Sequence, residues 1–461
     1  MGIIGDTRDN ALLTDLYELT MAAGYFQHGV NHTATFELFV RALPPNRSYL
    51  IVAGVEQVLT YLSRLRFHEE EIRFLQQHPI FRHVPPAFFD YLRTFRFRGE
   101  VWGIPEGNLV FAEEPILRVT APVIEAQIVE TFLLSMINFQ TLIATKASRV
   151  VWAAGKDGKR REVADFGSRR AHGPEAGVLA ARASYIGGCT STSNTYAGMF
   201  YQIPISGTMA HSWVMSFNKE EEAFRAFHQS FPEATILLID TYDTEAGAHL
   251  AVQIGPHIRG VRIDSGNAWA MSRKVRAILD RAGLTHVKIV VSGDLNEYLI
   301  QDLVDRGAPI DFFGVGTEMV TSKDAPALGG VYKLVEQEEG EKRRYRAKFS
   351  VEKATYPGKK QVFRFLDGEG RYVKDLIARE NEVPGRGAIP LLVPLMKGGE
   401  QLAPSPSLPE IQQKARDSLS RLPEVYRRLD NPRPYPVYKS QALEALFQQV
   451  QQEQRAFLKE R

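Results

Sequence analysis

A single histidine stands where a strand-like run meets a turn in the middle of the chain. His211 lies within GTMAHSW (207–213), directly after the apolar run QIPIS, which we expect to form a strand. An imidazole at a strand end can act as a base, or as a nucleophile that accepts a phosphoryl group. A lone histidine is often only a packed or capping residue. Asp240 could orient the ring, and Asp243 could do so instead or could cap a helix.

Five further apolar runs between residues 160 and 320 also end on polar or glycine residues. We expect these runs to be parallel strands, and the carboxyl ends of parallel strands meet at one edge of a sheet or barrel. Their polar ends would then form one shared site that includes His211. The strand ends are DFGSRR (165–170), LLIDTYDT (237–244), VRIDSGN (261–267), IVVSGD (289–294) and FFGVGTE (312–318).

The charged strand ends have a chemical and a structural interpretation, and the residues alone leave both open. Arg262 and Asp264 are two residues apart and so point to the same side of a strand, either as a binding pair or as a structural salt bridge. Arg169 and Arg170 could bind an anion beside the aromatic Phe166, or they could be a surface pair.

Glycine and hydroxyl residues predict a second kind of site. SGD (292–294) and GVGTE (314–318) are glycine-rich strand ends late in the repeat, where barrel enzymes usually bind phosphate. The turn GGCTSTSN (187–194) offers backbone N–H groups and hydroxyls to an anion, or it simply caps a helix.

The elements that must position these residues follow a repeating pattern. From about residue 163, short apolar strands alternate with helical runs, and the strand ends fall about 20 to 45 residues apart. A (β/α) barrel has about 30 residues per unit, and an open doubly wound sheet has a similar rhythm. We favour the barrel because nearly every strand ends on polar residues, which is where barrel enzymes keep their chemistry.

The remaining chain predicts a mixed N-terminal part and a C-terminal extension. We expect three segments: an N-terminal α/β sandwich domain over 1–125, an α/β barrel catalytic domain over 126–340, and a C-terminal segment over 341–461 that is part β, packs on the N-terminal domain and ends in a helical tail. Helices are expected over 11–29, 54–65 and 123–154, and strands over 33–43 and 95–122. Further β structure is expected up to about 379, followed over 410–461 by a polar helical tail of unassigned role.

Composition excludes several classes of protein. The 461 residues are 44% hydrophobic and 24% charged, as in an ordinary globular chain. The net charge of +2 gives no electrostatic case for nucleic acid or an anionic membrane. One cysteine rules out an intrachain disulfide framework, and no apolar run predicts a membrane span. We therefore expect a cytoplasmic protein.

Several of these segments, taken in order, resemble the nicotinate phosphoribosyltransferase family. The resemblance runs from about residue 11 to about 365 and is specific as a combination, although no single motif would be. The segments are TDLYELTMAAGYF, ATFELFVR, EGNLVFAEEPILRV, DFGSRR, GTMAHSW, RIDSGN, VSGDLNEYLI, GVGTEMVT and KATYPGKKQVFR.

The resemblance implies a fold and a reaction. The fold is the type II phosphoribosyltransferase fold, an irregular α/β barrel with an α/β sandwich formed mainly by the N-terminal segment. The reaction transfers 5-phosphoribosyl from its 1-diphosphate to nicotinate in NAD biosynthesis and releases pyrophosphate. In the family, ATP hydrolysis is coupled to it through a transient phosphohistidine, which matches His211. The resemblance also implies Mg²⁺, ATP as a co-substrate, and a homodimer with the active site at the subunit interface.

The resemblance also carries individual roles to this chain. The catalytic positions are His211, Asp240 and Asp264. Nicotinate contacts are Tyr17, donated across the dimer interface to stack on the ring, Phe166 on the other face, and Thr190, Thr208 and Arg262. Contacts to the phosphoribosyl diphosphate are Arg41 (or Arg47), Arg169, Ser292, Gly293, Asp294, Gly314, Gly316 and Thr317, and Mg²⁺ would lie near Asp264 and Asp294.

Acid selectivity follows from the turn before the histidine. In relatives that use nicotinamide, a carboxylate lies near the pyridine substituent. The comparable turn here, CTSTSN (189–194), has no acid, and hydroxyls can donate to a carboxylate. We therefore expect nicotinate to be preferred. The alternatives are a nicotinamide or quinolinate phosphoribosyltransferase on the same fold, or a non-catalytic barrel that binds a phosphorylated metabolite.

Overall fold

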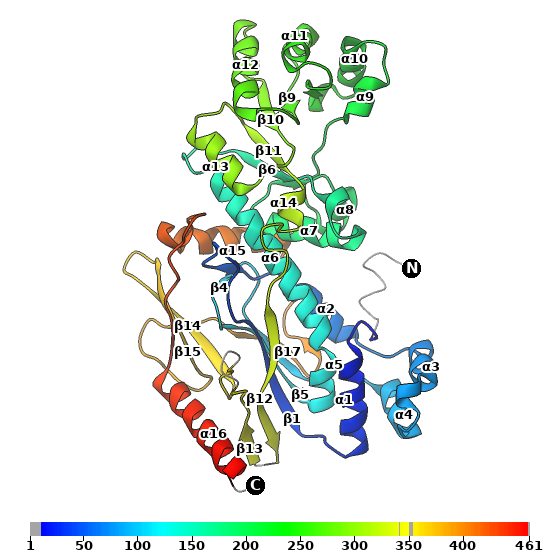
Figure 1. Ribbon diagram of the computed structural model, residues 1–461, viewed down its shortest axis with the longest axis vertical. Coiled ribbons are helices and arrows are strands. Elements are labelled where there is room, and N and C mark those ends of the chain that lie inside the picture. The colour runs from blue at the N-terminus through cyan, green and yellow to red at the C-terminus, as the bar shows by residue number, and fades with distance from the viewer. Residues whose placement is uncertain (1–10, 341, 350–353, 460–461) are drawn as a thin grey trace. The chain divides into compact units, whose positions relative to one another are not determined.

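Two compact units make up the chain in a computed structural model that describes residues 11–340, 342–349 and 354–459. The second unit runs from Ile143 to Pro326, and the first comprises the described residues on either side of it. The sequence interval that carries most of the candidate site therefore folds as one unit (Figure 1).

The second unit is built on six parallel strands whose apolar runs are buried. They pair in the order β7-β6-β11-β10-β9-β8, and no strand pairing joins β7 to β8 within the described residues. The α/β class and the parallel sheet are confirmed. The strands are β6 (Glu162–Asp165), β7 (Ser191–Thr192), β8 (Ile236–Leu238), β9 (Gly260–Ile263), β10 (Lys288–Val291) and β11 (Phe312–Val315).

Helices follow the strands and begin on capping side chains just past the strand ends. Asp243, Asn267 and Asn296 accept backbone N–H groups of the helices that they precede, which places each helix start beside the sheet edge. The helices are α6 (Glu130–Ala154, which begins in the first unit), η3 (Ser168–Arg170), α7 (Pro174–Ile186), α8 (Thr195–Tyr201), α9 (His211–Met215), α10 (Glu220–Ser230), η4 (Pro232–Ala234), α11 (Thr244–Ile254), α12 (Ala268–Arg281), α13 (Glu297–Asp305) and α14 (Thr317–Val320).

Two local predictions are wrong: the expected strand at 202–206 is irregular, and part of the expected turn at 187–194 forms a strand. The run QIPIS (202–206) forms no strand and contributes only a bridge between Ile205 and Thr192. Gln202 has a positive φ of 57° and Pro204 has no N–H to donate, so this run is a poor ladder partner. Two residues of the expected turn, Ser191 and Thr192, form β7 instead.

The first unit contains a seven-stranded sheet in the order β13-β12-β1-β5-β3-β17-β18, a four-stranded sheet β16-β14-β15-β19 and the pair β2-β4. Its helices are α1 (Leu16–Gln27), α2 (Val55–Arg64), α3 (Glu69–Gln77), η2 (Pro79–Phe81), α4 (Pro86–Thr94), α5 (Val123–Ile128), α15 (Leu408–Arg421), η5 (Glu424–Tyr426) and α16 (Gln441–Lys459). Its strands are β1 (Thr33–Val40), β2 (Leu50–Ile51), β3 (Glu100–Gly103), β4 (Leu109–Val110), β5 (Pro115–Pro122), β12 (Gly330–Glu339), β13 (Lys342–Tyr345), β14 (Lys360–Leu366), β15 (Tyr372–Arg379), β16 (Ile389–Pro390), β17 (Val393–Lys397), β18 (Glu400–Gln401) and β19 (Val437–Lys439).

The tail beyond residue 410 is not one helical region, which corrects the expectation. Strand β19 pairs in parallel with β15, with Val437 opposite Asp375. Pro432, Pro434 and Pro436 lie in the stretch before it and exclude a helix there. The tail thereby adds a strand to a sheet of the first unit.

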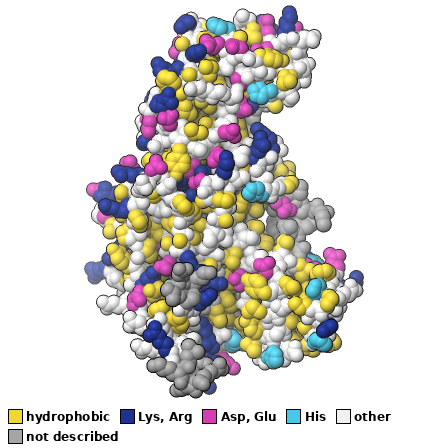
Figure 2. Space-filling model, in the orientation of Figure 1, with side chains coloured by type: hydrophobic (Ala, Val, Ile, Leu, Met, Phe, Trp, Pro, Cys, Tyr) yellow, Lys and Arg dark blue, Asp and Glu magenta, His cyan; other side chains and the backbone are white. Residues whose placement is uncertain are grey.

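One helical stretch, Val123–Ala154, is long and apolar enough to cross a membrane by length and composition alone. Most of its apolar window is buried within the structure, as in the core helix of a globular protein. On the face shown in Figure 2, acidic and basic side chains are interspersed and form no region of one sign. This distribution agrees with the small net charge.

Candidate active site

The carboxyl ends of the parallel strands bring most of the predicted residues to one edge of the sheet. The register places Asp165 beside Val315, and Val291 beside both Ile263 and Phe313. The residues that follow these positions therefore leave the sheet at the same edge. Arg262 lies beside Leu238 one strand further on, so the Asp240 loop joins the group.

His211 lies at the start of α9, and a hydroxyl orients its ring. The Nδ1 atom of His211 is 3.1 Å from Oγ1 of Thr241. The sequence predicted Asp240 or Asp243 as its partner, and this prediction is wrong. Asp240 accepts hydrogen bonds from the Asp264 N–H at 2.9 Å and from the Ser265 hydroxyl at 2.7 Å.

Asp243, the other candidate acid, also bonds to a group other than His211. Asp243 accepts the N–H of Ala246 at 2.8 Å and caps α11. Glu220, at the start of α10, was missed by the sequence analysis. Burial, together with the charges of Asp243 and Asp240, raises the pKa of Glu220 to about 7. A Lys-Glu-Glu-Glu run signals only a helix start, so nothing in the sequence singled this residue out.

Arg262, whose side chain is 13% exposed, connects the predicted nicotinate and phosphate contacts. Nη1 of Arg262 donates to Oγ1 of Thr208 at 2.6 Å, and Nη2 lies 4.0 Å from the Asp264 carboxylate. The Ser292 hydroxyl donates to the same carboxylate. Burial lowers the pKa of the Arg262 guanidinium, although Asp264 and Asp240 oppose this effect. A guanidinium with little competing water is well suited to bind an anion.

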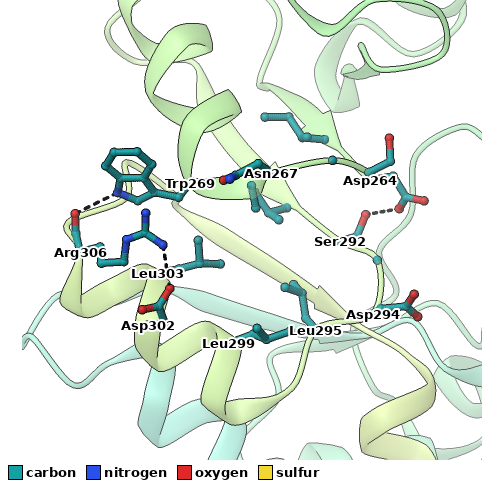
Figure 3. Close-up of a pocket in the computed structure, with 16 residues that line it drawn as sticks. Asp264, Asn267, Trp269, Ser292, Asp294, Leu295, Leu299, Asp302, Leu303 and Arg306 are labelled. Carbon is teal, nitrogen blue, oxygen red and sulfur yellow. Dashed lines mark hydrogen bonds and ion pairs between the residues drawn. The ribbon is translucent and has the colours of Figure 1, made fainter.

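A cavity of about 510 Å³ opens beside this network, between the loops that follow β9 and β10 (Figure 3). Arg306 donates to Asp302 at 3.0 Å and lies over the Trp269 ring at 4.3 Å. These three residues were missed because they lie on helices or at a helix end, away from any strand end. The lining includes Asp264, Asn267, Trp269, Ser292, Gly293, Asp294, Leu295, Leu299, Asp302, Leu303 and Arg306.

The turn Ser292-Gly293-Asp294 requires its glycine. Gly293 has a φ of +87°, and a β-carbon there would lie 2.1 Å from the carbonyl oxygen of Asp264. Asp294 also has a positive φ, of 35°. Only glycine allows this backbone to pass so close to the Asp264 loop, which leaves the turn open to the cavity.

Phe166 lies directly against the second glycine-rich strand end. A β-carbon on Gly314 would lie 2.4 Å from the Phe166 ring, and the Phe166 N–H donates to the Val315 carbonyl at 2.8 Å. Gly316 precedes the short helix α14, which begins at Thr317. Glycine at 314 is therefore needed to seat the ring at the edge of the sheet.

Asp165, the acid that precedes Phe166 in the same motif, makes contacts that were not predicted from the sequence. Asp165 is fully buried and accepts hydrogen bonds from the Gly167 N–H and the Thr192 hydroxyl, both at 2.8 Å. Burial raises the pKa of Asp165 to about 6. Arg169, by contrast, is exposed on η3. Asp165 thus ties β6 to β7.

The hydroxyl of Thr190 is directed to the backbone. It donates to the carbonyl of Val163 at 3.3 Å. Ser191 and Ser206 share a hydrogen bond of 2.7 Å. The turn still carries no acidic residue.

Two predicted contacts belong to the first unit. The Tyr17 side chain on α1 is 45% exposed, and partial burial together with the nearby Glu130 carboxylate raises the pKa of its hydroxyl. Arg41 follows β1 and is half-buried, whereas Arg47 is only 5% exposed and donates to the Pro45 carbonyl at 3.4 Å. Arg41 is therefore the better candidate of the two arginines to reach a ligand.

Known proteins are similar to this chain in sequence and in fold over nearly its whole length. Models of the nicotinate phosphoribosyltransferase N-terminal domain, family and C-terminal domain match residues 12–138, 161–336 and 386–447. A nicotinate phosphoribosyltransferase of Mycobacterium tuberculosis is 44% identical over 93% of this chain and 91% of its own, and one of Bacillus subtilis is 39% identical over 93% and 92%.

Solved structures agree. Human nicotinic acid phosphoribosyltransferase superposes with a TM-score of 0.83 at 30% identity, covering 95% of this chain and 99% of its own. Nicotinate-nucleotide pyrophosphorylase from Pyrococcus furiosus gives 0.74 at 26% identity, covering 90% and 97%. The chain belongs to the nicotinate phosphoribosyltransferase family and is an enzyme of this type.

Proposed function

We propose that the chain joins nicotinate to 5-phosphoribosyl 1-diphosphate, giving nicotinate mononucleotide and pyrophosphate for NAD biosynthesis in the cytoplasm, and that ATP drives the reaction through transient phosphorylation of His211. The observation that carries the proposal is the continuous set of contacts from Thr208 through Arg262 and Asp264 to Ser292. It connects a site for one carboxylate to a turn suited to a phosphate.

The nicotinate carboxylate would bind Arg262 and Thr208, and Phe166 would cover one face of the ring. Tyr17 of a second copy would cover the other face, which makes the enzyme a homodimer with shared sites. The exposure of Tyr17 supports this role. Further exposed apolar side chains on and beside α1, at Leu13, Leu16 and Met21, support a contact between copies.

The phosphoribosyl diphosphate would bind the glycine-rich turns. Ser292, Gly293 and Asp294 offer backbone N–H donors at the cavity. The further proposed contacts are Gly314, Gly316, Thr317, Arg169 and, from the second copy, Arg41.

The acidic residues at the cavity fit Mg²⁺ that arrives with the diphosphate. Asp264 and Asp294 both line the cavity, and one buried oxygen of Asp240 has no hydrogen-bond partner. Among the described residues, no group of three or more histidine, cysteine, aspartate or glutamate side chains could hold a metal. Asp264 and Asp294 would therefore share the ion with substrate oxygens, and the bound ion would neutralise charge on the leaving group.

The transfer itself needs positioning more than acid–base chemistry. The nicotinate ring nitrogen forms a bond to the anomeric carbon while the bond to pyrophosphate breaks, and positive charge develops on the sugar. In the coupled step a His211 ring nitrogen forms a bond to the γ-phosphorus of ATP and ADP leaves. Water later cleaves the nitrogen–phosphorus bond and releases phosphate. The added charge beside Thr241 would order the site for the diphosphate.

The proposal is tested by measuring mononucleotide formation from phosphoribosyl diphosphate with nicotinate, nicotinamide or quinolinate, each with and without ATP. We expect turnover with nicotinate that ATP increases. Turnover with quinolinate that ATP does not change would replace the proposal with a quinolinate enzyme. Preference for nicotinamide would contradict the role of Arg262.

Thr190→Asp should shift acceptor preference toward nicotinamide by about tenfold, because a carboxylate near the pyridine substituent repels nicotinate and accepts from an amide. The ratio of kcat/KM for the two acceptors is the measurement. Thr190→Asn, which removes the same hydroxyl without adding charge, is the control. An unchanged ratio in the aspartate variant would show that this turn does not face the substituent.

A further inference from the structure

A buried lysine on α6 bonds to two acids that follow different strands of the parallel sheet. Nζ of Lys146 lies 2.5 Å from Oε2 of Glu297 and 2.8 Å from Oδ1 of Asp324. The Lys146 side chain is 1% exposed and that of Glu297 is fully buried, whereas that of Asp324 is 31% exposed. Glu297 follows β10 and Asp324 follows β11, so one ammonium group connects the chain beyond two neighbouring strands.

Glu297 is fixed to the first of the two glycine-rich turns, at residues 292–294. It is the first residue of α13, and Asn296 accepts two backbone N–H groups of this helix at 3.0 and 2.9 Å. The helix therefore begins directly after the turn. Three further residues of α13 line the cavity (Figure 3): Leu299, Asp302 and Leu303. Glu297 thus anchors a helix that continues the turn and forms one wall of the cavity.

Asp324 is tied in the same way to the second glycine-rich strand end. Thr321 donates to the Thr317 carbonyl both from its N–H, at 3.2 Å, and from its hydroxyl, at 2.7 Å. The Lys323 N–H donates to the Glu318 carbonyl at 3.3 Å. These bonds connect the segment that carries Asp324 to the start of α14. Lys146 therefore links the two turns through one residue that follows each of them.

Stability alone does not account for a lysine at this position. Taking an ammonium group out of water costs free energy that its ion pairs often do not return in full, and an apolar side chain would fill the same space without that cost. Glu297 also pairs with Arg149 at 3.1 Å, so it has a second cation beside it. The specific contribution of Lys146 is the directional link to Asp324.

We propose that Lys146 is a positioning residue that sets the spacing between the two turns that bind phosphoribosyl diphosphate. The inference rests on the proposed function, in which residues 292–294 and 314–317 bind this substrate. Because Lys146 is 1% exposed, it acts through the turns and not by touching the substrate. Loss of the bridge lets the turns move independently, so the diphosphate binds more weakly. Nicotinate, held by Arg262 and Thr208, is not affected.

The test measures Kd for phosphoribosyl diphosphate by calorimetry in the presence of Mg²⁺, and KM for both substrates. Lys146→Met should raise Kd and KM for phosphoribosyl diphosphate about five- to twentyfold and change KM for nicotinate less than about twofold. Asp324→Asn should give the same pattern, and it keeps Lys146 paired with Glu297, so the buried charges stay balanced. Lys156→Met is the matched control, because Lys156 pairs with Asp305 at the other end of α13, at 2.8 Å, but is exposed. Its Kd should stay within about twofold of wild type.

A double variant distinguishes the bridge from two independent effects. Since Lys146 and Asp324 act through one contact, Lys146→Met/Asp324→Asn should weaken binding no more than either single change. Losses that multiply, or an equal rise of KM for both substrates, would overturn the proposal. Unchanged Kd values in both single variants would overturn it as well. Failure of the wild type to bind phosphoribosyl diphosphate would instead overturn the proposed function, and this inference with it.

Discussion

His211→Ala should remove the effect of ATP on mononucleotide formation while leaving the slow ATP-independent reaction. The variant has no nitrogen to accept the γ-phosphoryl group, so ATP can no longer order the site. At limiting phosphoribosyl diphosphate, we expect the rate with ATP to fall at least about tenfold, to the rate without it, which corresponds to about 1.4 kcal/mol. Acid-labile phosphate on the protein after incubation with labelled ATP should disappear as well.

The chain contains a matched control for this histidine. His228 is also half-buried, and its Nδ1 atom lies 2.9 Å from the hydroxyl of Thr235. Thr235 precedes β8, whereas Thr241, the partner of His211, follows it. His228→Ala should therefore keep both the ATP effect and the label. Equal ATP stimulation of the His211→Ala and His228→Ala proteins would rule out the phosphohistidine route.

The strand ends could be predicted from sequence because two local signals coincide there. Buried apolar runs such as residues 289–291 mark the strands, and Asp243, Asn267 and Asn296 start the helices that follow. The residues between the two signals must lie at the sheet edge. Arg262 and Asp264 could be paired in this way because they are only two residues apart.

The partners of these residues could not be predicted, because each depends on competition among groups far apart in the chain. An imidazole beside two carboxylates suggests an ion pair, yet one oxygen of each carboxylate accepts a backbone N–H, from Asp264 or from Ala246, and neither carboxylate bonds to the ring. Thr241 is left for His211. The contact between Thr208 and Arg262 depends on the path of an irregular loop, which no periodicity describes.

Buried acids are the other class of residue whose contacts could not be predicted from the sequence. Asp165 and Glu18 stand within motifs that were read for their aromatic neighbours, Phe166 and Tyr17. Each acid is fully buried and hydrogen-bonded to a threonine, which is Thr192 for one and Thr131 for the other. An acid next to an apolar run is ordinary in any sequence, so only the three-dimensional contacts show that these two are buried and hydrogen-bonded.

Arg262→Gln should reduce kcat/KM for nicotinate about 10- to 150-fold, because a hydrogen bond to a charged group contributes about 1.5–3 kcal/mol. The loss should be much smaller for nicotinamide, which has no carboxylate for the guanidinium to bind. This difference distinguishes recognition from support of the fold, since a collapsed site would lose both acceptors equally. Steady-state kinetics with the two acceptors are the measurement.

Arg259→Gln is the control for the same change of charge. Arg259 is exposed and lies just before β9, three residues from Arg262. Its substitution should alter either rate less than about twofold, as expected for a surface charge. If Arg262→Gln lowered the rates with nicotinate and nicotinamide by the same factor, Arg262 would serve mainly to hold Asp264 and Ser292, and the carboxylate of nicotinate would have to bind elsewhere along this edge.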